Sequence, residues 1–493
     1  MSAQIPERGS FLRKLIGNTI VGLGGTVLQK GLTFATTLIL ARGLGDEGFG
    51  LYSYVVAYIF LFAFLSDLGI DLVVTREVAR APDQAGQILG SAVLLKLASS
   101  ALAFVLAAGT AYRIDLPQEA RYCVVLAALG MPLSIERIFR AYFQSRYEVK
   151  VGFGATLPGT AAFLAVAAVC VHLKLPVYAL FVAMLVIGVL TLARVLSVSL
   201  PHIRLSLSPR WPEILTLLRD SWEVGLFVFL FIVTMRVDQV MLYHLRSAND
   251  VGLYAAVVRV SEALSIVPDA LLLTLFPLLV RTEQTAPERF RHTYRLGFKY
   301  LAALIVPIAL ALTLLRRDVV GIAFGPTYEG AASALAILAW NMFFAYTGAI
   351  YLHLFIAQAR QRLLLAVSTV AVVVNVVCNL LWIPAYGAAG AAVATVVANF
   401  AGFLCWCLVP VTRPYMLVCL GESWRPAVVA AAVLVVLWVL PLSPVASTVV
   451  MLGLFPLGLW ALGGVGWSDV VLVQRLFAHE DPSTAPATPR ESV

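Results

Sequence analysis

Charged side chains are scarce in this sequence of 493 residues. They make up 13% of it, whereas hydrophobic residues make up 61% and the mean hydropathy is +0.91. A soluble globular domain carries about 25% charged and about 45–50% apolar residues, so a water-soluble fold is excluded. Fourteen helices of about 20 residues each, the length that crosses a bilayer, would use roughly 280 residues and leave no room for a large soluble domain. We therefore predict an all-α polytopic membrane protein with fourteen transmembrane helices.

Motifs that carry enzymatic chemistry are also missing. The sequence contains no GxxxxGK[ST] loop, no HExxH, no GxSxG, no CxxC and no Asp-x-Asp. Its six cysteines lie in or beside apolar segments, where they are expected to pack as small hydrophobic residues, and its six histidines are scattered. The sequence therefore predicts a protein that is not an enzyme and that holds no metal and no cofactor.

The apolar runs between charged breaks predict the positions of the membrane spans. A stretch from 479 to 493 is rich in Pro, Ser, Thr and charge, and is expected to be disordered. The predicted spans are 17–40, 50–73, 87–111, 121–142, 151–173, 176–199, 219–243, 251–280, 296–315, 331–357, 363–384, 387–410, 426–441 and 445–463.

The net charge of +8 reflects membrane orientation and not a nucleic-acid surface. The N-terminus, the C-terminus and the loops on their side hold 20 Lys and Arg residues, against 7 on the other side. The positive-inside rule then places both termini in the cytoplasm of a multi-pass cell (inner) membrane protein. No short apolar stretch with an Ala-x-Ala site follows Arg13 and Lys14, so the first span is interpreted as a retained helix.

An internal repeat connects the two halves of the chain at an offset of 202 residues. The second copy begins after six spans, so the halves should be related by an axis along the membrane normal, as in many transporters. We expect an N-terminal lobe at 1–200, a C-terminal lobe at 201–412, two added helices at 413–467 and a cytoplasmic tail at 468–493. The matching residues are Gly50, Leu51, Tyr52, Val55, Val56 and Asp67 with Gly252, Leu253, Tyr254, Val257, Val258 and Asp269.

Thirteen charged residues inside the predicted spans are candidate functional residues. Each ionised side chain at a helix centre costs about 3 kcal/mol in lipid, so these residues must face the bundle interior, water or one another. The basic ones are Lys30, Lys96, Arg137, Arg140, Arg194, Arg236, Arg259 and Lys299, and the acidic ones are Asp67, Glu136, Asp238, Glu262 and Asp269.

Helical spacing separates the candidates. Lys30 continues a stripe of threonines and glycines along one face of the first span, which predicts an aqueous or ligand-bearing cavity there. Arg236 and Asp238 are two residues apart and point in different directions, so each needs another partner. Arg259 and Glu262, three residues apart, could instead neutralise one another as a structural ion pair.

The balance of eight basic against five acidic side chains favours a cavity that binds an anion, and phosphate suits Arg and Lys donors best. We predict substrate binding by Lys30, Arg236, Arg259, Lys96 and Arg140, although Arg140 could pair with Glu136. Candidate ion-coupling carboxylates are Asp67, Asp238, Glu262 and Asp269. Asn375 and Asn379, four residues apart, could bond a neighbouring helix or line a path.

Two stretches of the chain resemble the Wzx-type polysaccharide flippases of the multidrug/oligosaccharidyl-lipid/polysaccharide exporter superfamily: 40–55 continuing to 66–80, and 355–400. The resemblance implies two six-helix lobes plus two helices, and alternating access that carries an undecaprenyl-pyrophosphate-linked oligosaccharide from the cytoplasmic to the outer leaflet. It also implies an ion gradient or membrane potential as driving force, and a polysaccharide polymerase and glycosyltransferases as partners.

Other functions remain open from the sequence. A lipid II flippase would differ in cargo and not in mechanism. A drug/cation antiporter of the same superfamily would ordinarily have twelve spans and an acidic pocket. A membrane glycosyltransferase or polymerase would ordinarily have an acidic sugar-nucleotide site or a long external loop, and the external connections here are short.

Overall fold

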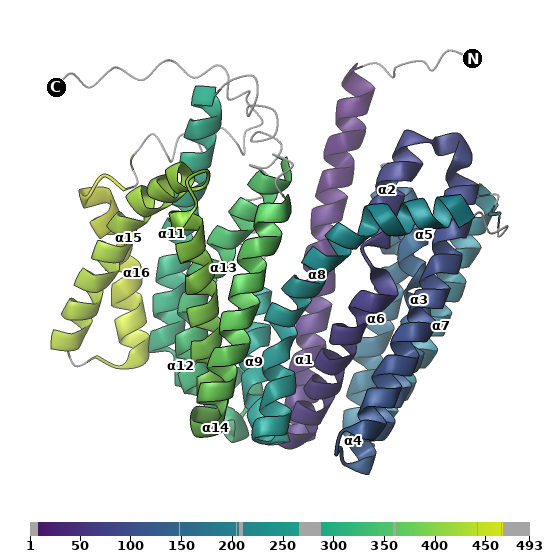
Figure 1. The fold of residues 1–493 in the computed structure, drawn as a ribbon. Coiled ribbons are helices and arrows are strands. Elements are labelled where there is room, and N and C mark those ends of the chain that lie inside the picture. The colour runs from purple at the N-terminus through teal and green to yellow at the C-terminus, as the bar shows by residue number, and fades with distance from the viewer. Residues whose placement is uncertain are drawn as a thin grey trace.

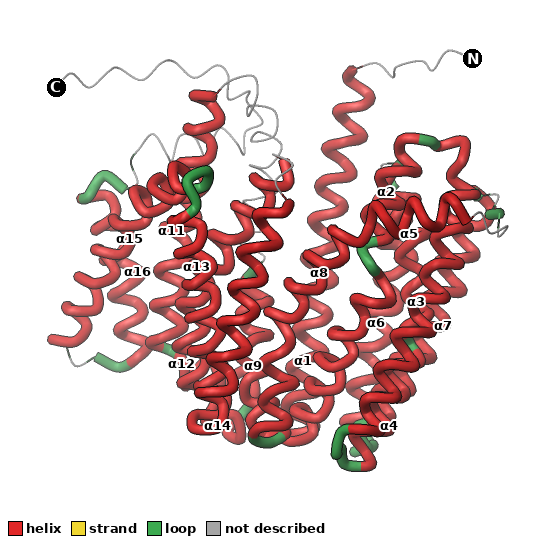
Figure 2. Tube along the Cα trace, viewed as in Figure 1, coloured by secondary structure: helices red, strands yellow, loops and turns green. Residues whose placement is uncertain are grey.

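The computed structural model describes residues 8–146, 148–203, 205–206, 211–265, 287–357, 361–440, 442–464 and 466. These residues form helices joined by short turns, and no strand occurs among them (Figure 2). This confirms the predicted all-α fold. Eleven segments of the described chain are long and apolar enough to cross a membrane.

Helices of the N-terminal half of the chain lie together on one side of Figure 1, in purple and blue. They are α1 (Arg8–Asp67), α2 (Ile70–Arg80), α3 (Ala85–Arg113), α4 (Gln118–Leu129), α5 (Glu136–Ser145), α6 (Val149–His172) and α7 (Tyr178–Ser199). The helices of the C-terminal half are α8 (Trp211–Leu245), α9 (Ala248–Leu264), α11 (Pro287–Leu314), α12 (Arg316–Phe324), α13 (Ala332–Ala357), α14 (Gln361–Leu408), α15 (Arg413–Val439) and α16 (Pro444–Ala461). Most of them lie on the other side of Figure 1, in green and yellow. Helices α1 and α9 lie between the two groups, and α8 extends from there across the N-terminal helices, where it contacts α2 and α3.

Two of the eleven segments are long enough to cross the membrane twice. Helix α1 breaks at Gly45 (φ 70°, ψ −178°), and α14 breaks at Gly387 (φ 54°, ψ −129°). A positive φ is tolerated by glycine because it has no Cβ, so the chain reverses there without a loop. Each break separates two predicted spans. The eighth predicted span, 251–280, is described only as far as Ser265, so the total of fourteen stays a prediction.

The fourth predicted span, 121–142, falls within one segment that is long enough to cross a membrane, Gln118–Ser145. A 3₁₀ turn that contains Pro132 (Met131–Ile135) interrupts this segment between α4 and α5. The predicted start of the thirteenth span was wrong. Helix α15 begins at Arg413, thirteen residues before the predicted start at 426. Its first turns bury Met416 and Cys419, and its one buried carboxylate, Glu422, pairs with Arg295 of α11. A hydropathy pattern stops at such charges, but a helix continues when they are paired.

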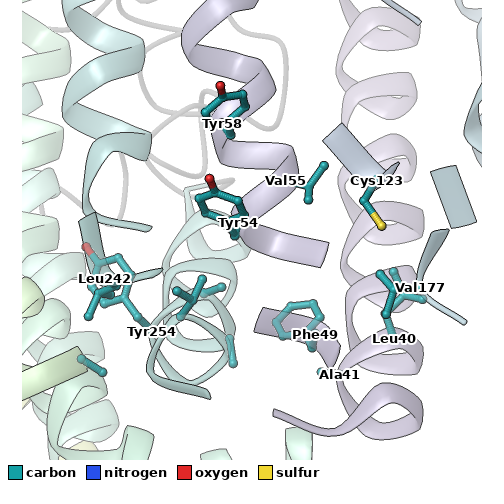
Figure 3. Packing of buried hydrophobic residues seen from close by; sticks show 14 of the residues in the cluster. Leu40, Ala41, Phe49, Tyr54, Val55, Tyr58, Cys123, Val177, Leu242 and Tyr254 are labelled. Atoms are coloured by element: carbon teal, nitrogen blue, oxygen red, sulfur yellow. The ribbon is translucent and has the colours of Figure 1, made fainter. Parts of the chain in front are cut away.

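The two halves meet at the end of the bundle where α1 and α14 reverse. Tyr54, Phe49 and Leu40 of α1 pack in one buried cluster with Leu242 of α8 and Tyr254 of α9 (Figure 3). Positive-inside counting predicts that this end is the external one. The core that joins the halves is concentrated at this end.

Polar contacts also join the halves at the end where α1 reverses. Arg42 of α1 donates to the carbonyls of Ile322 and Ala323, the two residues before the last residue of α12. Its Nε lies 2.8 Å from the Ala323 oxygen. The Tyr328 hydroxyl donates to the carbonyls of Ala41 and Gly45, each at 3.0 Å. Because these bonds join α1 to the C-terminal half, they must break before the halves can separate at this end.

Candidate functional site

Four charged side chains meet where α1, α8 and α9 adjoin. Glu262 of α9 accepts a hydrogen bond from Arg259 of the same helix, with 2.5 Å between Oε2 and Nη1. Its other oxygen, Oε1, lies 3.1 Å from Nη2 of Arg236 on α8. Lys30 of α1 donates from Nζ to the hydroxyl of Ser265, 2.8 Å away and one turn beyond Glu262. We call Lys30, Arg236, Arg259 and Glu262 the central charge cluster.

The central charge cluster lies well away from the end of the bundle where α1 reverses. A helix rises 1.5 Å per residue, so Arg259 lies roughly 16 Å along α9 from its start at Ala248, and Lys30 lies roughly 22 Å along α1 from the break at Gly45. Both distances are shorter than the thickness of the hydrocarbon core, about 30 Å. Three of the predicted substrate-binding residues are therefore brought together, from both halves of the chain, within the length of the spans.

The side chains of Arg236 and Arg259 are more deeply buried than that of Glu262. The exposed fraction of the side chain is 13% for Arg236 and 18% for Arg259, but 36% for Glu262. The guanidinium carbon of Arg236 lies 5.2 Å from the centre of the Phe60 ring, a cation–π distance. Among the described residues, Nη1 of Arg236 is buried and has no hydrogen-bond partner. A buried donor without an acceptor is costly, so this atom is suited to receive an oxygen of a ligand.

Among the described residues, the central charge cluster holds three cations and one carboxylate. Arg259 and Glu262 do form the structural ion pair that the sequence left open, but Glu262 is shared with Arg236 and cannot neutralise both. An anion is the ligand that this balance favours.

Lys96 belongs to a different cluster, inside the N-terminal half. Its side chain is fully buried, and Nζ lies 2.9 Å from Asp67 and 2.6 Å from Asp71. Arg137 of α5 lies 3.9 Å from the other oxygen of Asp67. Lys96 and Asp67 are thus held by partners at the break between α1 and α2, where Leu68 (φ 46°) and Gly69 (φ 75°) end the first helix. They are not part of the central charge cluster.

Arg140 also lies outside the central charge cluster. This residue of α5 packs its side-chain carbons over Gly152 of α6, within the N-terminal half. Oε2 of Glu136, the partner that the sequence offered for Arg140, is buried and has no hydrogen bond among the described residues. The predicted Asp269 lies outside the described residues.

Asp238 is the centre of a buried polar network in the C-terminal half. The side chain is 2% exposed. Its carboxylate accepts hydrogen bonds from Tyr254 of α9, Thr395 of α14 and Asn379 of α14, each at 2.6 Å. Asn379 also donates to Asn375 at 3.1 Å, so these asparagines bond a neighbouring helix and each other. Among the described residues no cation contacts Asp238, and the Oδ1 atom of Asn379 has no hydrogen-bond partner.

Sequence reasoning missed four contributors to these clusters. Asp71 lies four residues after Asp67 inside the span 50–73, so helical spacing could have found it. Ser265, Tyr254 and Thr395 gave no comparable signal, because a lone hydroxyl in an apolar helix most often bonds its own backbone. Among the described residues no group of three or more His, Cys, Asp or Glu side chains could hold a metal ion.

Comparison with known proteins identifies the family. Residues 15–283, more than half of the chain, match the model of the polysaccharide biosynthesis protein family. An uncharacterized membrane protein of Methanocaldococcus jannaschii, MJ1068, is 28% identical over 109 residues. That match covers 22% of this chain and 21% of the relative, so only about a fifth of the relative's length is spanned.

Two solved structures share the fold at low identity. The lipid II flippase MurJ in an inward closed conformation matches with a TM-score of 0.69 and 11% identity, over 93% of this chain and 100% of that one. An inward-facing multidrug resistance MATE family transporter of the MOP superfamily matches with a TM-score of 0.61 and 16% identity, over 80% of this chain and 96% of the other. The chain therefore belongs to the polysaccharide biosynthesis protein family and has the multi-pass membrane fold of the multidrug/oligosaccharidyl-lipid/polysaccharide exporter superfamily.

Proposed function

We propose that this protein is a flippase that translocates a prenyl-pyrophosphate-linked oligosaccharide from the cytoplasmic to the outer leaflet of the cell membrane. Its cargo would serve the biosynthesis of a cell-surface polysaccharide. The observation that carries the proposal is the central charge cluster: among the described residues, Lys30, Arg236 and Arg259 converge from both halves of the chain around a single carboxylate. A pyrophosphate diester carries two negative charges, which guanidinium and ammonium groups bind well.

In the proposed mechanism the halves alternate their access to the two sides of the membrane. The headgroup enters between the halves, where the three cations bind its phosphate oxygens, and the prenyl tail stays in lipid. Guanidinium and ammonium groups form charge-assisted hydrogen bonds with phosphate that are about twice as strong as neutral ones. Bonds made by Arg42 and Tyr328 support an external side that is closed in this conformation. We place both termini in the cytoplasm.

Asp238 is our proposed coupling site. A buried carboxylate surrounded by hydroxyl and amide groups, with no basic side chain in contact among the described residues, is suited to bind a proton or a monovalent cation. The network joins α8, α9 and both parts of α14, so occupation of Asp238 would change how these helices pack. Two helices of that network, α8 and α9, also carry the central charge cluster.

Rival functions differ in what the central cluster would bind. A cation antiporter would need a negative site, and the three cations that meet in the central charge cluster disfavour it. Lipid II also presents a pyrophosphate, so it is the alternative cargo. Polysaccharide polymerase and glycosyltransferases are proposed as partners that use and supply the cargo, and no catalytic step is assigned to this chain.

The proposal is tested by changing the three cations singly to Ala and measuring lipid-linked precursor on the cytoplasmic face. Arg194→Ala is the matched control, because Arg194 also lies inside a membrane span but has an exposed side chain. We expect precursor to accumulate in Lys30→Ala, Arg236→Ala and Arg259→Ala and not in the control. Normal translocation by all three variants at wild-type protein levels would overturn the proposed site.

Mass spectrometry of lipid that co-purifies with the protein identifies the cargo. A prenyl-pyrophosphate oligosaccharide would support our proposal. A muropeptide-bearing lipid would replace it with the lipid II alternative, and recovery of a cationic compound would exclude both.

A further inference from the structure

Glu262 occupies the position where a ligand oxyanion would bind. Its two oxygens contact different arginines, Arg236 at 3.1 Å and Arg259 at 2.5 Å, which come from α8 and α9. An oxyanion with two oxygens directed at the same two guanidinium groups would make equivalent bonds. The carboxylate and an anionic headgroup therefore compete for the same donors.

Burial within the cluster shows which partner is able to leave. Arg236 is fixed by its packing over Phe60 and is only 13% exposed, whereas the Glu262 side chain is 36% exposed. A carboxylate at the edge of the cluster can turn towards water at lower cost than a guanidinium that would lose its packing. Arg236 also has its buried Nη1 atom without a partner among the described residues, so the cluster is not saturated by Glu262 alone.

Without Glu262, Arg236 and Arg259 would lie near each other with no carboxylate between them among the described residues. Like charges that are partly removed from water repel one another, and an unpaired buried charge is strongly destabilising. Glu262 offsets part of this positive charge when no ligand is bound. A headgroup that displaces it must therefore bind the arginines better than the carboxylate does, which favours a dianion over a monoanion.

We propose that Glu262 is an internal counter-anion that exchanges with the headgroup of the cargo: it pairs with Arg236 and Arg259 in the empty protein, swings aside when a pyrophosphate binds, and returns when the cargo leaves. The exchange rests on the proposed function. It makes Glu262 a determinant of specificity and of release, in place of the ion-coupling role that the sequence left open for it.

The test compares binding of inorganic pyrophosphate and inorganic phosphate to the purified full-length protein by titration calorimetry. Glu262→Gln keeps the size of the side chain and removes its charge. We expect this variant to bind pyrophosphate about tenfold more tightly than the wild type and to discriminate less between pyrophosphate and phosphate. Translocation by the variant should be slower, because release no longer has a competing carboxylate.

The matched control is Glu77→Gln. Glu77 is also contacted by two arginines, Arg76 at 2.8 Å and Arg80 at 3.3 Å, but it lies on α2 away from the cluster. Its variant should bind pyrophosphate as the wild type does. Glu262→Asp, whose shorter carboxylate cannot reach both arginines from the same backbone position, should bind with an affinity between those of the wild type and Glu262→Gln. Thermal unfolding of each variant shows whether it is folded.

The two proposals fail in different ways. If Arg236→Gln and Arg259→Gln weaken pyrophosphate binding but folded Glu262→Gln and Glu262→Asp bind like the wild type or more weakly, the exchange is wrong and the anion site stands. If the arginine variants bind pyrophosphate as the wild type does, the proposed function is wrong and the exchange fails with it.

Discussion

Gly50 of α1 packs against the backbone at the start of α9. Gly252 of α9 packs against the backbone of α1 just after its break at Gly45. A Cβ on Gly50 would lie 1.7 Å from the carbonyl oxygen of Ala248, and a Cβ on Gly252 would lie 2.0 Å from the carbonyl oxygen of Asp46. Both the glycines and the carbonyl residues are 202 positions apart, the offset of the internal repeat. The contact is therefore reciprocal, as at a twofold axis, and the repeat marks the place where the halves touch.

Gly50→Ala and Gly252→Ala should each force the two helices apart, because the obstructing atoms are backbone and cannot turn away. We expect a loss of stability of about 1–3 kcal/mol, the usual cost of overpacking. An external cysteine probe at Ala41→Cys, in a background without the six native cysteines, should be labelled several-fold faster by an impermeant maleimide. Gly109→Ala is the control, since nothing lies within 4 Å of its added Cβ. Unchanged labelling in both variants would contradict the contact.

Arg42→Gln should loosen the external closure from the side of α12. The variant loses the guanidinium that donates to Ile322 and Ala323, which leaves two carbonyls near the end of α12 without that donor. Hydrogen exchange of the amides of α12 should become faster, by about tenfold for a loss of about 1.4 kcal/mol. Arg113→Gln, an exposed arginine at the end of α3, is the control and should leave that exchange unchanged. Exchange in Arg42→Gln that is as slow as in the wild type would show that other contacts hold α12.

Asp238→Asn should abolish the dependence of transport on an ion gradient. The substitution replaces one accepting oxygen of the carboxylate with an NH₂ group that donates. This group would face the donating group of Tyr254 or Asn379, which costs about 1–3 kcal/mol of stability. Transport in proteoliposomes with an imposed sodium or proton gradient measures the coupling. The wild type and the exposed-loop control Asp83→Asn should respond to the gradient, and Asp238→Asn should not. A variant that still responds would remove Asp238 from the coupling mechanism.

Lys96→Met should destabilise the N-terminal half without altering the affinity for a headgroup. It leaves Asp67 and Asp71 facing each other without their shared ammonium group, and breaking a buried ion pair by removing one partner costs about 3–5 kcal/mol. Thermal unfolding measures the loss. Adding Asp67→Asn and Asp71→Asn should restore much of the stability, because the repelling charges are then gone. If the single variant melts with the wild type but binds pyrophosphate weakly, Lys96 contacts the ligand and its placement in a separate cluster is wrong.

The central charge cluster shows which contacts helical periodicity can predict and which it cannot. Residues three or four positions apart lie on the same face of a helix, so Arg259 and Glu262 could be placed together from the sequence. Arg236 could only be said to need a partner, because periodicity gives a direction and not the neighbour in that direction. Lys96 was grouped with Arg236 and Arg259 on sign alone, yet its buried position between two aspartates separates it from them. Charge predicts that a residue avoids lipid, but not which interior it enters.

By itself the sequence determined the membrane location, most of the helices and the repeat of Gly50 in Gly252, since these follow from hydropathy and from residue identity at a fixed offset. Only the tertiary structure decided that Lys30 reaches Ser265 across the two halves, and that Asp238 meets Tyr254, Thr395 and Asn379. The physical reason is that membrane helices gain little from the hydrophobic effect when they associate. Close packing of small residues and bonds between polar side chains therefore select their neighbours, and both depend on contacts between residues far apart in the chain.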